Sequence, residues 1–184
     1  GKSSAVYLNG LSSALVQPTK CLDIAKDYSV IAWFSLDDKN ATHQTVFNTI
    51  HHNCLDIVYN HPPSFNRLRF QMGDGTRWFF EDSGGLNFDY QSKKWFMVVF
   101  TKNQNRESLF VNGEIDSTSS TSISGPILVG WQIGSIGDGS IDLVGQVFKG
   151  AIDDVRIYNR ALSAAEVTAL YDAEKAIPPV LTRQ

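Results

Sequence analysis

The sequence contains little of what would mark it as a nucleic-acid-binding, membrane-spanning or zinc-binding protein. Its 184 residues include 16 lysines and arginines against 19 acidic residues, which gives a net charge of −3. The longest basic run, Lys93-Lys94, is too short to follow a phosphate backbone, so we expect no nucleic-acid partner. No apolar run approaches the roughly 20 residues of a membrane-spanning helix. With two cysteines there is no second pair to build a zinc site.

The two cysteines, Cys21 and Cys54, leave two interpretations open. They are either separate free thiols or one disulfide joining loops at one end of the domain, which a secreted protein would favour. Residues 1–4 contain neither an initiator methionine nor a signal peptide. We therefore expect the chain to be a segment of a longer precursor that is secreted or displayed at the cell surface.

Short runs of alternating apolar and polar residues, separated by turn residues, dominate the chain. In residues 28–36, the core side is expected to carry Val30, Ala32, Phe34 and Leu36. Residues 95–101 are apolar on both faces, which indicates a buried central strand. Asn112-Gly113 favours a type I′ hairpin turn, because both residues tolerate a positive φ. About ten to twelve such runs predict an all-β fold of two packed antiparallel sheets.

One short helix is expected after the last strand. Ser163 and Glu166 have the spacing of a capping box, and Leu162 and Val167 flank it as a hydrophobic staple. The helix should end near residues 174–175, because the prolines that follow cannot continue it. The predicted domain therefore spans residues 1–175, and residues 176–184 form a linker to a following domain.

Residues 148–167 resemble the C-terminal signature of laminin-G-like jelly-roll domains, which have the concanavalin A-like lectin/glucanase fold. Further segments resemble the family's opening strand, second strand and central hairpin, namely residues 6–10, 28–34, 94–101 and 109–113. The resemblance covers most of residues 5–172. It implies a two-sheet jelly roll appended to a larger secreted protein. It does not imply one function, because this scaffold hosts glycan binding, adhesion and hydrolysis.

The resemblance also implies a structural calcium ion. Its ligands would be the acidic pair Asp153 and Asp154, together with backbone oxygens near Asn9 and Gly10. Calcium takes six to eight oxygen ligands in a flexible shell, which carboxylates and carbonyls can supply.

The spacing around the acidic pair has a second interpretation. Ile152 and Val155 both have core character, which breaks strict alternation and predicts a β-bulge between them. Without calcium, the pair would be an exposed acidic turn or would form an ion pair with Arg156 or Arg160.

A glycan-binding face is expected from strand alternation. Sugars need aromatic rings for their C–H faces and planar polar side chains for paired hydroxyls. Trp33, Asp56, Arg69 and Gln71 alternate with core residues, so they are expected to share one concave face. The alternative is that Trp33 is a covered scaffold residue and that Arg69 pairs with Asp56.

A second set of candidate ligand contacts lies in or beside predicted loops: His51, Tyr59, Arg77, Trp78 and Trp131. Tryptophan and arginine in loops are frequent anchors of recognition sites. Arginines and histidines would suit an anionic or sulfated glycan, since arginine binds such groups bidentately. The alternative is that the tryptophans are buried and the histidines solvated.

No catalytic motif is present, so we do not expect an enzyme. Retaining glycosidases need two carboxylates about 5 Å apart, whereas Glu81, Glu107 and Glu114 stand apart in the sequence. The sequence favours a monomeric, non-catalytic carbohydrate-binding module, joined in its parent chain to a catalytic or anchoring domain. The alternative is a protein-interaction, adhesion or spacer module without glycan affinity.

Overall fold

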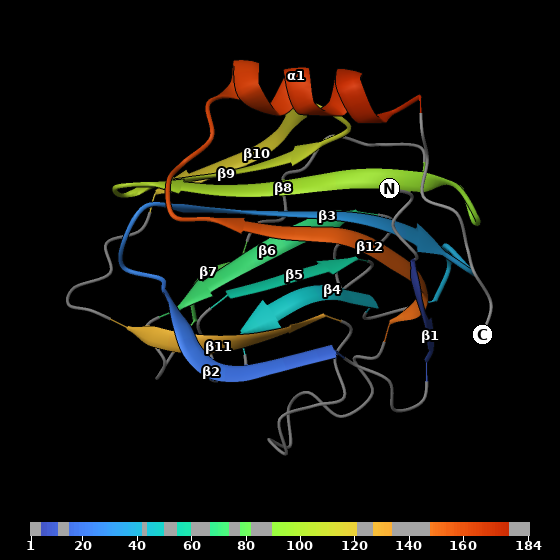
Figure 1. The fold of residues 1–184 in the computed structure, drawn as a ribbon, viewed down its shortest axis with the longest axis horizontal. Helices are drawn as coiled ribbons and strands as arrows, with labels where there is room; N and C mark the ends of the chain where they lie inside the picture. The colour runs from blue at the N-terminus through green and yellow to red at the C-terminus, as the bar shows by residue number, and fades with distance from the viewer. Residues whose placement is uncertain are drawn as a thin grey trace.

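The computed structural model describes residues 5–10, 15–41, 44–49, 55–59, 67–73, 78–81, 90–120, 127–133 and 148–176. Two six-stranded antiparallel sheets pack face to face, and helix α1 (Ala164–Glu174) lies on the outside of one of them (Figure 1). The predicted two-sheet jelly roll with a short C-terminal helix is therefore confirmed. No helix in the described ranges has the length and apolarity needed to cross a membrane.

The sheet beneath the helix is called the back sheet. Its strands lie in the order β1 (Val6–Asn9), β12 (Lys149–Tyr158), β3 (Tyr28–Leu36), β8 (Trp95–Asn103), β9 (Arg106–Val111) and β10 (Glu114–Ser120). The other sheet is called the front sheet. Its strands lie in the order β2 (Leu15–Asp23), β11 (Leu128–Ile133), β4 (Gln44–Thr49), β5 (Leu55–Tyr59), β6 (Leu68–Gly73) and β7 (Trp78–Glu81).

The main core lies between the two sheets and follows the predicted alternation. Val30, Ala32, Phe34 and Leu36 of β3 are buried in it, together with apolar residues from both sheets. Burying one large apolar side chain of this kind stabilises the fold by about 1.5–3 kcal/mol. The intervening residues of β3 are buried as well, because helix α1 covers the other face of the back sheet. Residues 95–101 form the predicted central strand, since β8 lies between β3 and β9.

Helix α1 begins where the sequence predicts. The Ser163 Oγ accepts a hydrogen bond from the Glu166 amide at 3.3 Å, and the Glu166 carboxylate accepts one from the Ser163 amide at 2.8 Å. Leu162 and Val167 are buried in a second apolar cluster with Met97 and other back-sheet residues. The capping box fixes the start of the helix, and this cluster holds the helix on the sheet.

The hairpin turn and the β-bulge that the sequence predicts are both present. Asn112 and Gly113 have φ angles of 51° and 83°, as the predicted hairpin turn requires. The Thr168 hydroxyl of α1 donates a hydrogen bond to the Gly113 carbonyl at 2.9 Å, so this turn also supports the helix. The register of β12 shifts between Asp153 and Arg156, and Asp154 has a φ of 51°. The β-bulge predicted there is confirmed.

Candidate functional site

The polar residues of β6 lie on the outer face of the front sheet, as the sequence predicts. Leu68, Phe70 and Met72 are part of the main core. Arg69 and Gln71 alternate with them and therefore lie on the opposite face of the sheet. Both are buried, with 2% and 5% of their surfaces exposed. This outer face is the best candidate for a ligand-binding surface.

A transverse row of five polar residues crosses the front sheet at this level. Backbone pairing sets the following residues opposite one another in order: Gln132, Asn48, Asp56, Gln71 and Glu81. Neighbouring strands lie about 4.8 Å apart, so the row extends over roughly 19 Å. Of the row's side chains, those of Asn48 and Gln71 are described, and their amides supply both the donors and the acceptors that a ligand rich in hydroxyl groups requires.

Strand β4 contributes two buried polar atoms to the same face. Thr45 pairs with Val58, which pairs with Arg69, and Asn48 belongs to the transverse row. A register shift between Thr45 and Phe47 brings Thr45 and Asn48 onto one face, although their spacing of three would otherwise separate them. In the described part of the chain, Thr45 Oγ1 and Asn48 Oδ1 have no hydrogen-bond partner. Such atoms are rare in native proteins, because a buried polar atom without a partner costs about 1–3 kcal/mol.

Trp33 does not belong to this face, so the prediction that it lies beside Arg69 and Gln71 is wrong. It lies on β3 of the back sheet, under helix α1, and only 4% of its surface is exposed. Its ring stacks on Tyr171 with centroids 6.0 Å apart. Strand alternation placed Trp33 correctly opposite the core, but it could not show which sheet β3 joins. The alternative of a covered scaffold residue is the one that the structure supports.

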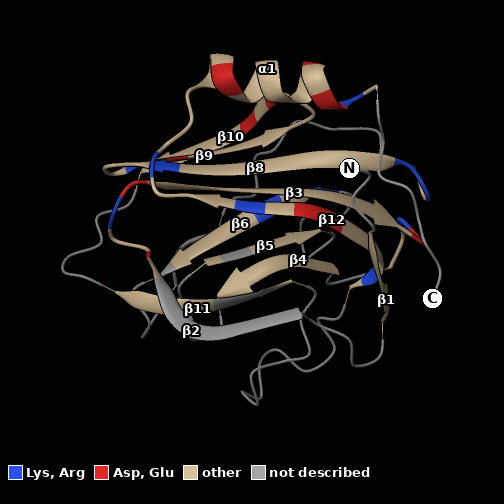
Figure 2. Ribbon diagram, in the orientation of Figure 1, with Lys and Arg blue, Asp and Glu red and all other residues tan. Residues whose placement is uncertain are grey.

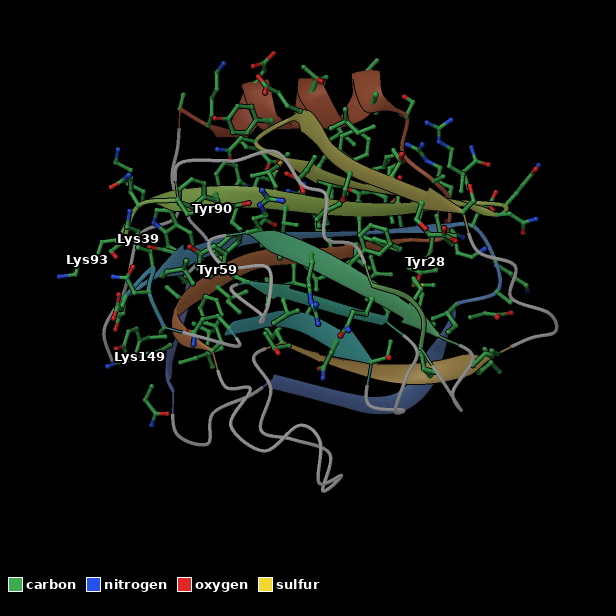
Figure 3. The ribbon with its side chains drawn as sticks, turned by 180° about the vertical axis from the view of Figure 1, so that it is seen from behind. Tyr28, Lys39, Tyr59, Tyr90, Lys93 and Lys149 are labelled. Atoms are coloured by element: carbon green, nitrogen blue, oxygen red, sulfur yellow. The ribbon has the colours of Figure 1, made fainter. Side chains whose placement is uncertain are left out.

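Tyr59 lies in the main core, not among ligand-contacting loops. Its ring meets that of Tyr90 edge-on with centroids 4.9 Å apart, and its hydroxyl donates to the Lys39 carbonyl at 3.0 Å. Figure 3 shows these two tyrosines together near one end of the sandwich. Burial, followed by the nearby charge of Asp38, raises the pKa of Tyr59 to about 12. Tyr59 is therefore a neutral structural residue.

The other loop candidates are described only in part. His51 and Arg77 lie outside the described residues, as do Cys54 and residues 177–184 of the predicted linker. The structure gives only backbone positions for the remaining candidates. Trp78 begins β7, Trp131 pairs with Thr49, Asp56 pairs with Gln71, and Cys21 lies on β2. Their roles, and the proposed disulfide, stay predictions.

The predicted calcium ligands do not come together. Asn9 pairs with Lys149, which is four residues along β12 from Asp153 and therefore about 13 Å away along the strand. Gly10 lies against the Lys149 side chain, and a lysine beside the site disfavours a cation. Within the described ranges, no three His, Cys, Asp or Glu residues are grouped so that they could hold a metal ion. Asn9 therefore lies apart from the acidic pair along the strands, and the structural calcium ion stays a prediction.

Asp154 of the acidic pair instead takes part in holding helix α1. The Asp154 carboxylate lies 3.1 Å from the Arg156 guanidinium, which also lies 2.7 Å from Glu174 of the helix. Burial raises the pKa of Asp154, although Arg156 opposes the change. This arrangement matches the ion-pair alternative that the sequence left open. It also explains why the bulge turns Asp154 outward, towards Arg156.

A protein-family model matches the chain and identifies the superfamily that the C-terminal motif indicated. The model of the concanavalin A-like lectin/glucanase superfamily matches residues 8–168, which is most of the chain. The chain belongs to this superfamily. The sequence resemblance is thereby confirmed. No curated protein matches this concanavalin A-like domain.

Several solved structures share the fold of the concanavalin A-like domain. Domain 4 of AbnA, an extracellular GH43 arabinanase from Geobacillus stearothermophilus in complex with arabinotriose, has a TM-score of 0.69 at 22% identity, covering 91% of this chain and 76% of that one. The botulinum neurotoxin serotype D ligand binding domain in complex with N-acetylneuraminic acid has a TM-score of 0.66 at 15% identity, covering 94% and 42%. The binding domain of Paraclostridial Mosquitocidal Protein 1 has a TM-score of 0.69 at 18% identity, covering 92% and 43%.

Identities this low establish a shared fold alone. The domain also spans less than half of the two toxin binding domains. The ligands named above are bound by those proteins, and this comparison does not assign them to the present domain.

Sequence reasoning missed Thr45 and Asn48 as members of the front face, and it missed the strand pairing that sets Gln132 and Glu81 in line with Asn48. A strand over residues 44–49 was not among the expected elements, because its bulge interrupts the alternation of apolar and polar residues. The transverse row depends on the pairing of five strands. No spacing within a single strand could have revealed it.

Proposed function

We propose that this domain is a non-catalytic carbohydrate-binding module of a larger secreted protein, and that it binds a poly- or oligosaccharide on the outer face of the front sheet. One observation carries the proposal. Thr45 Oγ1 and Asn48 Oδ1 are buried polar atoms without a partner in the described residues, and they lie on one face with Arg69 and Gln71. Thr45 and Asn48 are only 0% and 3% exposed, so a sugar hydroxyl would satisfy these enclosed atoms through a bridging water, which both donates and accepts.

Superfamily membership and the structural neighbours support the same assignment. One neighbour is a domain of an extracellular arabinanase with bound arabinotriose, and another is a toxin binding domain with bound N-acetylneuraminic acid. Both are parts of larger extracellular proteins. A module of this kind would raise the local concentration of a linked catalytic domain at a polymeric substrate. We infer from the polar row that a neutral, hydroxyl-rich glycan is the ligand class.

The test is a titration of the domain with soluble plant, algal and host polysaccharides, followed by variants of the front face. Asn48→Ala and Gln71→Ala should each weaken binding of any glycan hit by about tenfold, the effect of losing a buried hydrogen bond worth about 1.4 kcal/mol. Thr118→Ala on β10, an exposed residue of the back sheet, is the matched control and should bind as the wild type. Circular dichroism and thermal unfolding confirm that each variant is folded.

Three results would contradict parts of the proposal. Equal glycan affinity in the wild type and both front-face variants would place the site elsewhere. Absence of binding to every glycan by folded domain would favour a protein-interaction, adhesion or spacer role. Hydrolysis of a bound glycan would contradict the non-catalytic assignment, and the same titrations reveal it as released reducing ends.

A further inference from the structure

A groove of about 950 Å³ lies along one side of the sandwich, away from the outer face of the front sheet. It is bounded by β12 of the back sheet and by β2 and β11 of the front sheet, with the turn between β2 and β3 at its rim. Tyr28, which also lines it, lies at the end of the sandwich opposite Tyr59 and Tyr90 (Figure 3). Asn48 and Gln71, the members of the polar row whose side chains are described, do not line the groove.

Within the part of the chain that the structure describes, the end of the strand that borders this groove has a neighbouring strand on one side only. β1 pairs with β12 only from Lys149 to Ile152, where the bulge at Asp154 follows. From Arg156 to Tyr158, β12 pairs with β3 on one side. On its other side, this part of β12 pairs with none of the strands in the described ranges. An edge of this kind presents unpaired backbone N–H and C=O groups, which can pair with an added strand.

The floor of the groove is apolar and incompletely covered. Val155 and Ile157 pack against the margin of the main core but are only partly buried. Leu22 is buried below them, and Leu128 has 51% of its surface exposed. Alternate residues of an added strand would point onto this floor, because side chains along a strand alternate between its two faces.

The rim of the groove is mainly acidic. Asp27 is exposed, and Asp23 lies beside it on the same turn. The cation at the rim, Lys26, lies 3.7 Å from the Asp23 carboxylate and is itself largely exposed. Figure 2 shows these charges of both signs on the turn between β2 and β3. A basic side chain would therefore find a favourable position beside Asp27.

We propose that this groove binds an extended polypeptide segment that adds as a strand to the open edge of β12 between Val155 and Tyr158. The segment carries alternating apolar side chains, which cover Leu128, and a lysine or arginine, which meets Asp27. It belongs to another domain or another protein. A second copy that pairs edge to edge through the same strand is the alternative occupant that the test must exclude.

The test uses the isotope-labelled domain and a synthetic peptide, acetyl-Thr-Val-Lys-Val-Thr-Val-Thr-amide, observed by NMR. We expect saturable shifts of the backbone amides of residues 155–158, because an added strand pairs with that edge. Two further peptides are methylated either on the valine nitrogens or on the other backbone nitrogens. One of the two should lose binding, since only alternate N–H groups of a strand face its neighbour. A peptide with glutamate in place of lysine should bind several-fold more weakly.

A pair of domain variants locates the contact. Leu128→Asp should weaken peptide binding by about tenfold, because it puts a charge on the apolar floor. Ile115→Asp on β10 is the matched control, since Ile115 is similarly exposed, at 46%, on the other edge of the back sheet. It should bind the peptide as the wild type. If Leu128→Asp does not fold, the methylated peptides still test the proposal on the wild-type domain.

Three outcomes overturn this inference. They are no saturable shift at residues 155–158 of the folded domain, equal binding of both methylated peptides, and dimerisation or glycan binding through these same residues. Its failure is distinguishable from failure of the glycan proposal, because a glycan on the front sheet should shift the amides of β4 and β6. One set of spectra therefore tests both the edge of β12 and the outer face of the front sheet.

Discussion

Trp33 of the back sheet and Glu174 of helix α1 are joined by a hydrogen bond, in which the indole Nε1 donates to Glu174 Oε2 at 2.9 Å. The same carboxylate oxygen lies 2.7 Å from Arg156 Nη2 of β12. Glu174 is the last residue of α1, so this contact fixes the C-terminal end of the helix to two strands. Trp33 therefore helps to hold helix α1 on the back sheet, and its substitution should change the stability of the domain.

Trp33→Phe should destabilise the domain without affecting glycan binding. The variant keeps an aromatic ring under the helix but leaves Glu174 without its indole donor, which costs about 1–3 kcal/mol. Urea unfolding measures the loss, and glycan titration of the folded variant should match the wild type. Loss of glycan affinity in folded Trp33→Phe would return this residue to the list of ligand contacts.

Acid should loosen the docking of α1 through Glu174. Burial raises the pKa of this carboxyl, but hydrogen bonds from Arg156 and Trp33 bring it below its usual value of 4.5. A carboxyl with a depressed folded pKa stabilises the protein above its unfolded pKa, and this stabilisation is lost as the pH falls through the folded pKa. Glu174→Gln should therefore lose stability at neutral pH and less at low pH. Unfolding curves from neutral pH to about pH 3 should converge, whereas parallel curves would contradict the assignment.

Two threonines on β4 should respond oppositely to the same substitution. Thr49 Oγ1 accepts from the Leu55 amide at 3.0 Å, so Thr49→Val leaves a buried donor unpaired and should cost about 1–3 kcal/mol. Thr45→Val removes a hydroxyl without a partner in the described residues, so its stability should be unchanged or slightly higher. Glycan affinity should fall in Thr45→Val and persist in Thr49→Val. The reverse pattern would exclude β4 from the site.

The N-terminal cap of α1 should be a separate source of stability. Ser163→Ala removes the hydroxyl that accepts from the Glu166 amide, and such a change costs about 1 kcal/mol. In a domain of this size, that corresponds to a melting temperature lower by roughly 2–4 °C. Differential scanning calorimetry measures it. Ser163→Asp, which keeps a side-chain acceptor at the cap, should restore most of the loss, and failure to do so would mean that the cap contributes little.

Calcium, if it stabilises this domain, should do so without Asp154. The carboxylate is paired with Arg156, and Asn9 lies far along the strand from Asp153. Any rise in melting temperature on adding calcium should therefore be equal in the wild type and in Asp154→Asn, because a ligand of the folded state acts only through its own site. Abolition of a calcium effect by Asp154→Asn would show that the acidic pair is a ligand after all.

Features that depend on neighbouring residues were predictable from the sequence. The capping box of Ser163 and Glu166, the hairpin turn at Asn112, and the bulge before Val155 all appear where they were expected. Each depends on a few consecutive residues whose φ angles or hydrogen bonds are set by local sterics. The assignment of Val30 and Phe34 to the core was correct for a related reason, because side chains along a strand alternate between its faces.

Features that depend on strand pairing were not predictable. Alternation placed both Trp33 and Arg69 opposite the core, but only the pairing shows that they lie on different sheets, on opposite sides of the molecule. The same limit applies to Asp153 and Asn9. The family resemblance implied that they lie together, whereas the register of β1 and β12 separates them along the strands.

The sequence by itself determined a two-sheet superfamily domain, its capped helix and which strand residues enter the core, since these follow from local geometry and periodicity. Only the tertiary structure decided which polar residues meet. The row from Gln132 to Glu81 and the open edge of β12 arise from hydrogen bonds between strands that lie far apart in the chain. Register is specified by those long-range contacts, so the sites they create become visible only once the sheets are assembled.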